Sequence, residues 1–114
     1  VGVGWALDLA DQLASSASIE VVDLRTLVPW DRETVLASVR KTHRVLVVHE
    51  ASRTSGFGAE IAAEISEVAF RDLDAPAVRV GGADLPIPFS KGIESDVYSG
   101  RARLADAARS LLAC

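Results

Sequence analysis

The residues best suited to chemistry stand close together near the middle of the chain. His49 and Glu50 are neighbours that could act as an acid–base pair, and Arg53 could bind a carboxylate or a phosphate. Two glycines, Gly56 and Gly58, then lead into an apolar run with helical spacing. Because the unpaired N–H groups at a helix N-terminus can hold an anion, this loop is a candidate for anion binding or for an interface.

A structural role competes with each of these chemical roles. Neighbouring residues on a strand point to opposite faces, so His49 and Glu50 share a site only if the strand has already ended. We therefore favour hydrogen bonding at the end of a sheet for both side chains. A dinucleotide-binding loop needs a third glycine where this chain has Ile61, so a tight turn is favoured over a phosphate site.

The remaining reactive side chains do not form a self-contained active site. His43 fits a solvated turn, and it has no second histidine at the spacing of a metal site. Asp23 and Arg25 share a face at the end of an expected strand, where an ion pair is the simplest interpretation. Cys114 has no second cysteine as a partner, which excludes an internal disulfide and favours a reducing compartment, the cytoplasm.

The pattern of apolar residues predicts the scaffold that positions these side chains. Residues 45–48 are apolar on both faces, as in a parallel strand covered by helices on both sides. The other predicted strands are residues 1–4, 19–24 and 77–80. The predicted helices are residues 5–15, 31–41, 57–72 and 101–113.

One long segment, residues 83–100, shows no sustained period and is expected to be an irregular surface excursion. Its apolar side chains Leu85, Ile87 and Phe89 suggest that it lies on something.

Strands that alternate with helices imply a mostly parallel sheet in a three-layer α/β/α arrangement. We predict the strand order 2-1-3-4. Ligands of such sheets bind at the carboxyl ends of the strands beside the switch in order. A site is therefore expected in the loops after Gly4 and Glu50.

Composition sets the class of protein. With 114 residues, of which 49% are hydrophobic, the chain has the size of one folded domain. A net charge of -4 and scattered arginines argue against nucleic acid, and no apolar run approaches the roughly 18 residues of a membrane span. The chain contains no methionine, and its first predicted strand is short. We therefore interpret residues 1–114 as one domain of a longer protein.

Several motifs of the chain match those of a known family in order and spacing. They are residues 21–31 (VVDLRTLVPWD), 47–51 (VVHEA), 56–61 (GFGAEI), 73–76 (LDAP) and 86–89 (PIPF). With them the chain resembles the C-terminal domain of the β subunit of thiamine-diphosphate-dependent 2-oxo acid dehydrogenases, a transketolase C-terminal-like domain.

This resemblance implies a multienzyme complex. A pyrimidine-binding domain would precede this one, and the full enzyme would oxidatively decarboxylate a 2-oxo acid and acylate a lipoyl group. Thiamine diphosphate and Mg²⁺ would not be bound by this domain alone, so the isolated domain is expected to be inactive and to contain no catalytic, cofactor-binding or metal-binding residues. The implied partners are the α subunit and a second β subunit of a heterotetramer, and the lipoyl acyltransferase component.

The resemblance assigns one docking residue and leaves the substrate open. Asp74 matches a position at which family members present an acid to the basic binding domain of the acyltransferase. Residues 75–84 resemble pyruvate dehydrogenases and residues 27–31 resemble branched-chain enzymes, so pyruvate is favoured only slightly.

A free-standing small-ligand-binding module of flavodoxin or receiver type is the alternative. A receiver needs paired acids at the end of the first strand, where this chain has Gly4 and Trp5. A flavin site there would favour hydroxyl groups, and yellow colour in the purified protein would support it.

Overall fold

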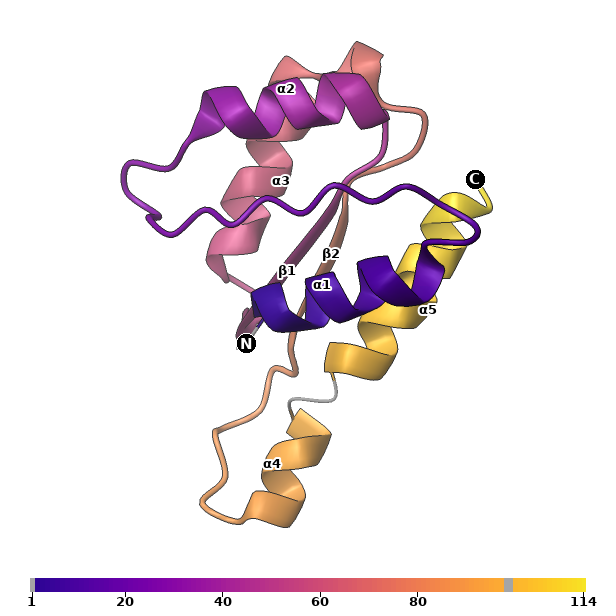
Figure 1. Ribbon diagram of the computed structural model, residues 1–114. Coiled ribbons are helices and arrows are strands. Elements are labelled where there is room, and N and C mark those ends of the chain that lie inside the picture. The colour runs from indigo at the N-terminus through magenta and orange to yellow at the C-terminus, as the bar shows by residue number, and fades with distance from the viewer. Residues whose placement is uncertain (1, 98–99) are drawn as a thin grey trace.

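The computed structural model describes residues 2–97 and 100–114 (Figure 1). The helices are α1 (Gly2–Leu13), α2 (Arg32–Thr42), α3 (Phe57–Val68), α4 (Lys91–Val97) and α5 (Gly100–Leu112), with a 3-10 turn at Phe70–Asp72. The strands are β1 (Leu46–Ser52) and β2 (Val78–Gly82). None of the helices within these described ranges is long and apolar enough to span a membrane.

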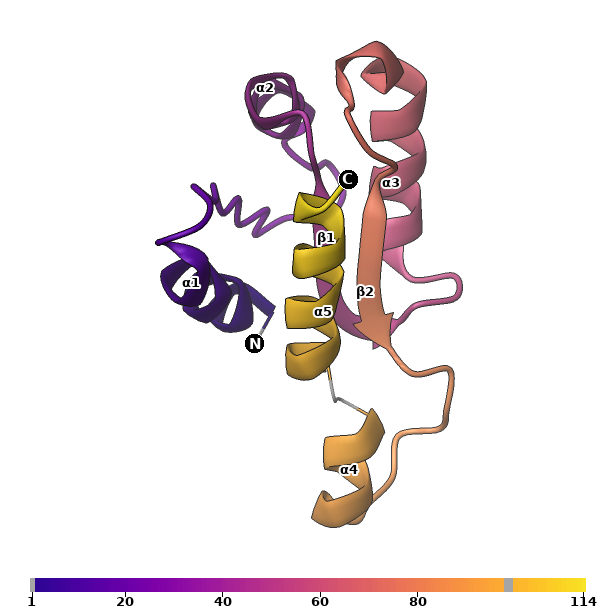
Figure 2. The ribbon, with the colours of Figure 1, turned by 90° about the vertical axis from the view of Figure 1, so that its right-hand side faces the viewer.

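The two strands pair in parallel and stand between helices α1 and α3 in the side view of Figure 2. They separate two hydrophobic cores. One core lies between the sheet and helices α2 and α3, and includes Val39 and Ile65. The other lies between the sheet and helices α1 and α5, and includes Leu9 and Leu104. Alternate residues of β1 contribute to opposite cores, because successive side chains of a strand point to opposite faces. The α/β layering predicted from the sequence is therefore confirmed.

Local sequence explains where α2 begins and ends. Asp31 caps its N-terminus by accepting hydrogen bonds from the Thr34 backbone N–H (3.1 Å) and hydroxyl (2.6 Å). Both bonds lower the pKa of the Asp31 carboxyl, and the bond from the Thr34 hydroxyl has the larger effect. The helix ends where His43 adopts a left-handed conformation with φ of 61°.

The predicted strand at residues 1–4 is wrong, since Gly2 already belongs to α1 and residue 1 lies outside the described residues. The N-terminus of α1 contacts β1, where a Cβ on Gly2 would lie 3.7 Å from the Val48 carbonyl oxygen. The helix predicted at residues 5–15 is present as α1, which runs from Gly2 to Leu13 and packs Trp5, Leu9 and Leu13 into the second core.

Residues 19–24 do not form the predicted strand either. Among the described residues the sheet has two strands, β1 and β2, and no backbone bond joins residues 19–24 to β1. Val22 and Leu24 instead pack against the first core by their side chains. Of the predicted strand order 2-1-3-4, the described residues contain the pairing of the third and fourth strands, which are β1 and β2. Residues 19–24 reach the core because their side chains are apolar. A strand, however, also needs a neighbouring strand whose N–H and C=O groups pair with its own.

The other differences concern element ends. Strand β1 continues to Ser52 instead of ending at residue 48, and α3 ends at Val68, before the 3-10 turn. The excursion expected at residues 83–100 contains the short helix α4, whose first turn is closed by the Glu94 N–H donating to the Ser90 carbonyl oxygen (2.9 Å).

Candidate functional site

The end of β1 holds His49 in a pocket made by glycines. Its Nδ1 hydrogen-bonds the Ala51 carbonyl oxygen at 3.0 Å, an arrangement in which Nδ1 carries the proton. A Cβ added to Gly56, Gly58 or Gly81 would lie 2.7, 2.4 or 2.9 Å from the imidazole ring. The glycines thus make space for the ring, and His49 forms the hydrogen bond expected at a strand end. Its Nε2 is buried without a hydrogen-bond partner in the described structure.

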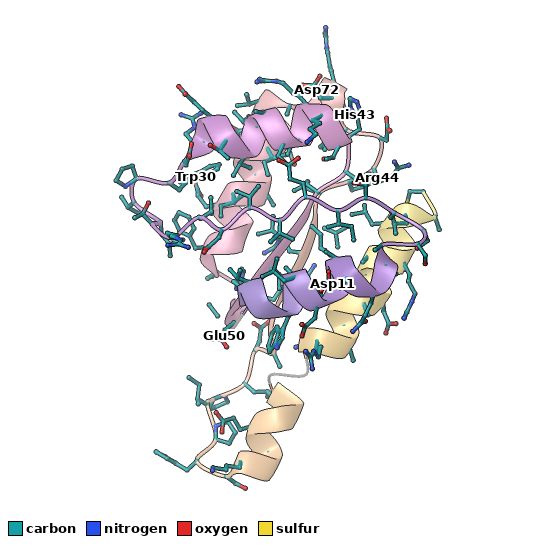
Figure 3. The ribbon with its side chains drawn as sticks, in the orientation of Figure 1. Asp11, Trp30, His43, Arg44, Glu50 and Asp72 are labelled. Carbon is teal, nitrogen blue, oxygen red and sulfur yellow. The ribbon has the colours of Figure 1, made fainter. Side chains whose placement is uncertain are left out.

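Glu50 does not join His49 in an acid–base pair. Because β1 continues past both residues, their side chains leave opposite faces of the strand. Glu50 is exposed at the carboxyl end of β1 (Figure 3), and no hydrogen bond or ion pair of its carboxylate is present in the described part of the chain.

The carboxylate of Asp84 closes the loop after β1. Asp84 accepts hydrogen bonds from the Thr54 backbone N–H (3.1 Å) and hydroxyl (2.5 Å). The hydroxyl bond and then the backbone bond lower the pKa of the Asp84 carboxyl, and the nearby charge of Arg53 lowers it further. A phosphate at Thr54 would have to displace this carboxylate and would be repelled by it. The loop of Arg53, Gly56 and Gly58 therefore serves as an internal clasp, and an interface role for it stays a prediction.

The opposite, amino ends of the strands carry a second charged group. The Asp74 N–H donates to the His43 carbonyl oxygen at 2.8 Å, which fixes the turn before β2 against the turn before β1. The Asp74 carboxylate lies 3.8 Å from Nη1 of Arg44, and 59% of its side chain is exposed. Nη2 of Arg44 donates to the Cys114 carbonyl oxygen at 2.7 Å. Asp74 is thus both held in place and accessible, as a docking acid must be.

The labelled residues at this end gather beyond the C-terminus of α2 (Figure 3). Nδ1 of His43 hydrogen-bonds the Asp72 carbonyl oxygen at 2.7 Å, and the Asp72 carboxylate lies 3.5 Å from Nε of Arg40. His43 is exposed, as expected, but it also ends a helix. The predicted ion pair of Asp23 and Arg25 is confirmed at 3.1 Å.

Sequence reasoning missed a cavity at the carboxyl ends of both strands. Its volume is about 130 Å³, and Glu50, Ala51, Ser52, Gly82, Ala83, Leu85 and Ile87 line it. The cavity adjoins the loop after Glu50, where a ligand site was expected, and a ligand there stays a prediction; Gly4 lies in a helix and does not line the cavity. Leu85, Ile87 and Phe89 are 60, 70 and 108% exposed, so the expectation that their segment lies on something stays a prediction. The apolar side chains of residues 85–89 were the sequence signal for this cavity, because an irregular segment in full contact with water does not require apolar residues.

Thiamine diphosphate and Mg²⁺ do not fit the residues that the structure describes. Magnesium prefers several oxygen ligands in octahedral geometry, and within residues 2–97 and 100–114 no three His, Cys, Asp or Glu side chains gather in a group that could hold a metal. We therefore assign no step of a reaction to these groups here.

The two parallel strands and the helices on their faces define a layered α/β domain. Residues 1–100 match the transketolase C-terminal domain family. The chain belongs to this family, which replaces the flavodoxin- or receiver-like alternative.

Several relatives of the chain are β subunits of 2-oxo acid dehydrogenases, as the sequence motifs indicated. The chain is 51% identical over 94 residues to 2-oxoisovalerate dehydrogenase subunit beta 2, mitochondrial, of Arabidopsis thaliana, covering 78% of this chain and 26% of the relative. It is 45% identical over 93 residues to pyruvate dehydrogenase E1 component subunit beta-2, mitochondrial, of Oryza sativa subsp. japonica, covering 81% of this chain and 25% of the relative. It is 36% identical over 112 residues to pyruvate dehydrogenase E1 component subunit beta of Rhizobium meliloti (strain 1021), covering 97% of this chain and 24% of the relative. The chain thus spans about a quarter of the length of these relatives.

Proposed function

We propose that this chain is the C-terminal interface and partner-docking domain of the β subunit of a thiamine-dependent 2-oxo acid dehydrogenase. The observation that carries the proposal is the family match over residues 1–100, combined with relatives that are dehydrogenase β subunits. A pyrimidine-binding domain would precede residue 1, and thiamine diphosphate and Mg²⁺ would be bound by other domains. The β subunit would form a heterotetramer with an α subunit and a second β subunit. We also propose a cytoplasmic location, which cell fractionation would test.

The 2-oxo acid in this proposal is pyruvate or a branched-chain acid. The sequence motifs slightly favoured pyruvate, whereas the identities to the 2-oxoisovalerate dehydrogenase subunits of Arabidopsis thaliana (51%) and Dictyostelium discoideum (55%) favour a branched-chain acid. Competition between the two acids for the assembled enzyme is the measurement that separates them.

Asp74 is the proposed contact for the basic binding domain of the acyltransferase component. Its carboxylate is mostly exposed, and its backbone is anchored to His43, so a partner meets a charge in a fixed place. Arg44, 3.8 Å away, already neutralises part of that charge. We therefore expect a contribution to association rate and to salt sensitivity, which is typical of charges at the edge of an interface.

The test uses the full-length β subunit and the acyltransferase component. Asp74→Lys is expected to weaken binding roughly tenfold or more at low salt, with a smaller effect at high salt. Asp74→Asn removes the charge without adding repulsion toward Arg44, and should lose less. Asp106→Lys is the matched control, because Asp106 is also an acid with an exposed side chain (79%), on α5. Equal affinities for the Asp74 and Asp106 variants would remove Asp74 from the docking surface.

A further inference from the structure

The side chain of Arg44 lies between the turn of Asp74 and the C-terminal end of α5 (Figure 3). Its Nη2 donates a hydrogen bond to the Cys114 carbonyl oxygen at 2.7 Å, and its Nε is buried without a hydrogen-bond partner in the described part of the chain. The side chain is 32% exposed, so its stem is largely packed against other residues. The guanidinium group is therefore held in two ways, by the packing of its stem and by a carbonyl oxygen.

This anchoring leaves the Asp74 carboxylate incompletely paired. Nη1 of Arg44 lies 3.8 Å from it, a distance that allows an ion pair but is too long for a hydrogen bond. Because the guanidinium group is a rigid fork, moving Nη1 onto the carboxylate would disturb the bond of Nη2 to the Cys114 carbonyl oxygen. Asp74 therefore keeps its oxygen atoms open to a hydrogen-bond donor of a partner.

The other charges at this end of the strands do not add up to an acidic surface. The Asp72 carboxylate is paired with Nε of Arg40 at 3.5 Å, and Arg71 adds an exposed cation. Within the described residues, Arg44 is the cation that forms an ion pair with Asp74. Since the charges nearly cancel, the balance between Asp74 and Arg44 has a direct effect on how strongly this end attracts a basic partner.

The position of Asp74 does not depend on the side chain of Arg44. Its N–H donates to the His43 carbonyl oxygen at 2.8 Å, which is a bond between backbone groups. A partner's cation bonded to Asp74 would lie within about 7 Å of Nη1 of Arg44, because a charged hydrogen bond adds about 2.8 Å to the 3.8 Å of the ion pair. At this separation in water, the repulsion between two unit charges changes a binding constant roughly threefold.

We propose that Arg44 restrains docking at Asp74: the Cys114 carbonyl oxygen holds it back from the acid, which stays open, while its charge lowers the affinity for a basic side chain of the acyltransferase binding domain. This inference rests on the function proposed above and names the residue that regulates the same contact. The site then favours a lysine or arginine that hydrogen-bonds Asp74 directly, because a more distant cation gains less from the acid and is still repelled by Arg44.

The test measures binding of the acyltransferase component to the full-length β subunit, assembled with its α subunit, at low and at high salt. Arg44→Gln should raise the affinity roughly threefold at low salt and less at high salt. Arg44→Met, which also removes the charge but keeps an apolar stem, should give the same gain. Arg101→Gln is the matched control, because Arg101 also pairs with an aspartate, Asp8, but lies in the first turn of α5, at the other end of that helix from Cys114.

The Asp74→Asn background shows where Arg44 acts. There Arg44→Gln should gain little, because a neutral side chain no longer holds the partner's cation beside Arg44. An affinity that neither Arg44 variant raises, an equal gain from Arg101→Gln, or a full gain in the Asp74→Asn background would overturn this inference alone. Absence of binding by the unchanged subunit would overturn the proposed docking function and this inference with it.

Discussion

The contact between Gly58 and His49 gives the sharpest prediction about the fold, because two effects of Gly58→Ala oppose each other. Alanine is favoured over glycine within a helix by up to about 1 kcal/mol. Its Cβ would, however, lie 2.4 Å from both Cδ2 and Nε2 of His49 and 3.2 Å from Cγ1 of Val47. Carbon atoms in contact normally stand about 3.5–4.0 Å apart.

The steric effect should dominate, because the ring cannot simply move away. Its Nδ1 is bonded to the Ala51 carbonyl oxygen, and Gly81 lies against it from the neighbouring strand. Overpacking costs about 1–3 kcal/mol, so we expect a net loss of ~1 kcal/mol in the free energy of unfolding. With a urea m value of about 1.5 kcal/mol/M, the midpoint of unfolding would fall by roughly 0.7 M.

A double-mutant cycle separates the two effects. In the His49→Ala background the clash is absent, so Gly58→Ala should stabilise the protein by up to about 1 kcal/mol, giving a coupling energy of ~2 kcal/mol. Gly4→Ala is the matched control, since Gly4 also lies in a helix and a Cβ there would meet nothing within 4 Å. If Gly58→Ala raised the urea midpoint as much as Gly4→Ala does, the packing of His49 against glycine would be refuted.

Two further predictions concern the clasp and the core. The bonds from Thr54 hold the pKa of Asp84 below its ordinary value, so the unfolded chain binds the proton more readily. The stability that this adds is present above about pH 4 and is lost as the pH falls through the lowered pKa. Thr54→Val should therefore weaken the dependence of the free energy of unfolding on pH in this range. An unchanged pH dependence would contradict the clasp. In the first core, Ile65→Ala should cost about 2–5 kcal/mol because Ile65 is 0% exposed, whereas Phe70→Ala, at 74% exposure, should change the urea midpoint little; similar losses for both would contradict the assignment of the core.

Periodicity in the sequence predicted the elements that carry their own signals. Helix α2 has an N-capping aspartate followed by a clear apolar face, and β1 is apolar on both sides, so both were found. The helix predicted from residue 5 was found, but its first turn was missed because Gly2 and Gly4 are unfavourable in helices. Residues 19–24 were read as a strand because pairing with a neighbour leaves no mark in one sequence.

The site was predictable to a smaller extent. The sequence indicated that Arg53, Gly56 and Gly58 share a loop after the strand of His49, but not that the glycines make space for the imidazole ring. Asp84 closes the loop from 30 positions away, a contact that spacing along the chain cannot reveal. The cavity beside Glu50 is likewise formed by two segments brought together through parallel pairing of β1 and β2.

Decarboxylation by the assembled enzyme tests the central claim most directly. The full-length β subunit would be purified with its α subunit and assayed for turnover of pyruvate and of a branched-chain 2-oxo acid, with and without thiamine diphosphate and Mg²⁺. We predict turnover of one of these acids that depends on the cofactor, and none by residues 1–114 alone. Turnover by residues 1–114 alone, or no turnover of either acid by the assembled subunits, would contradict the account.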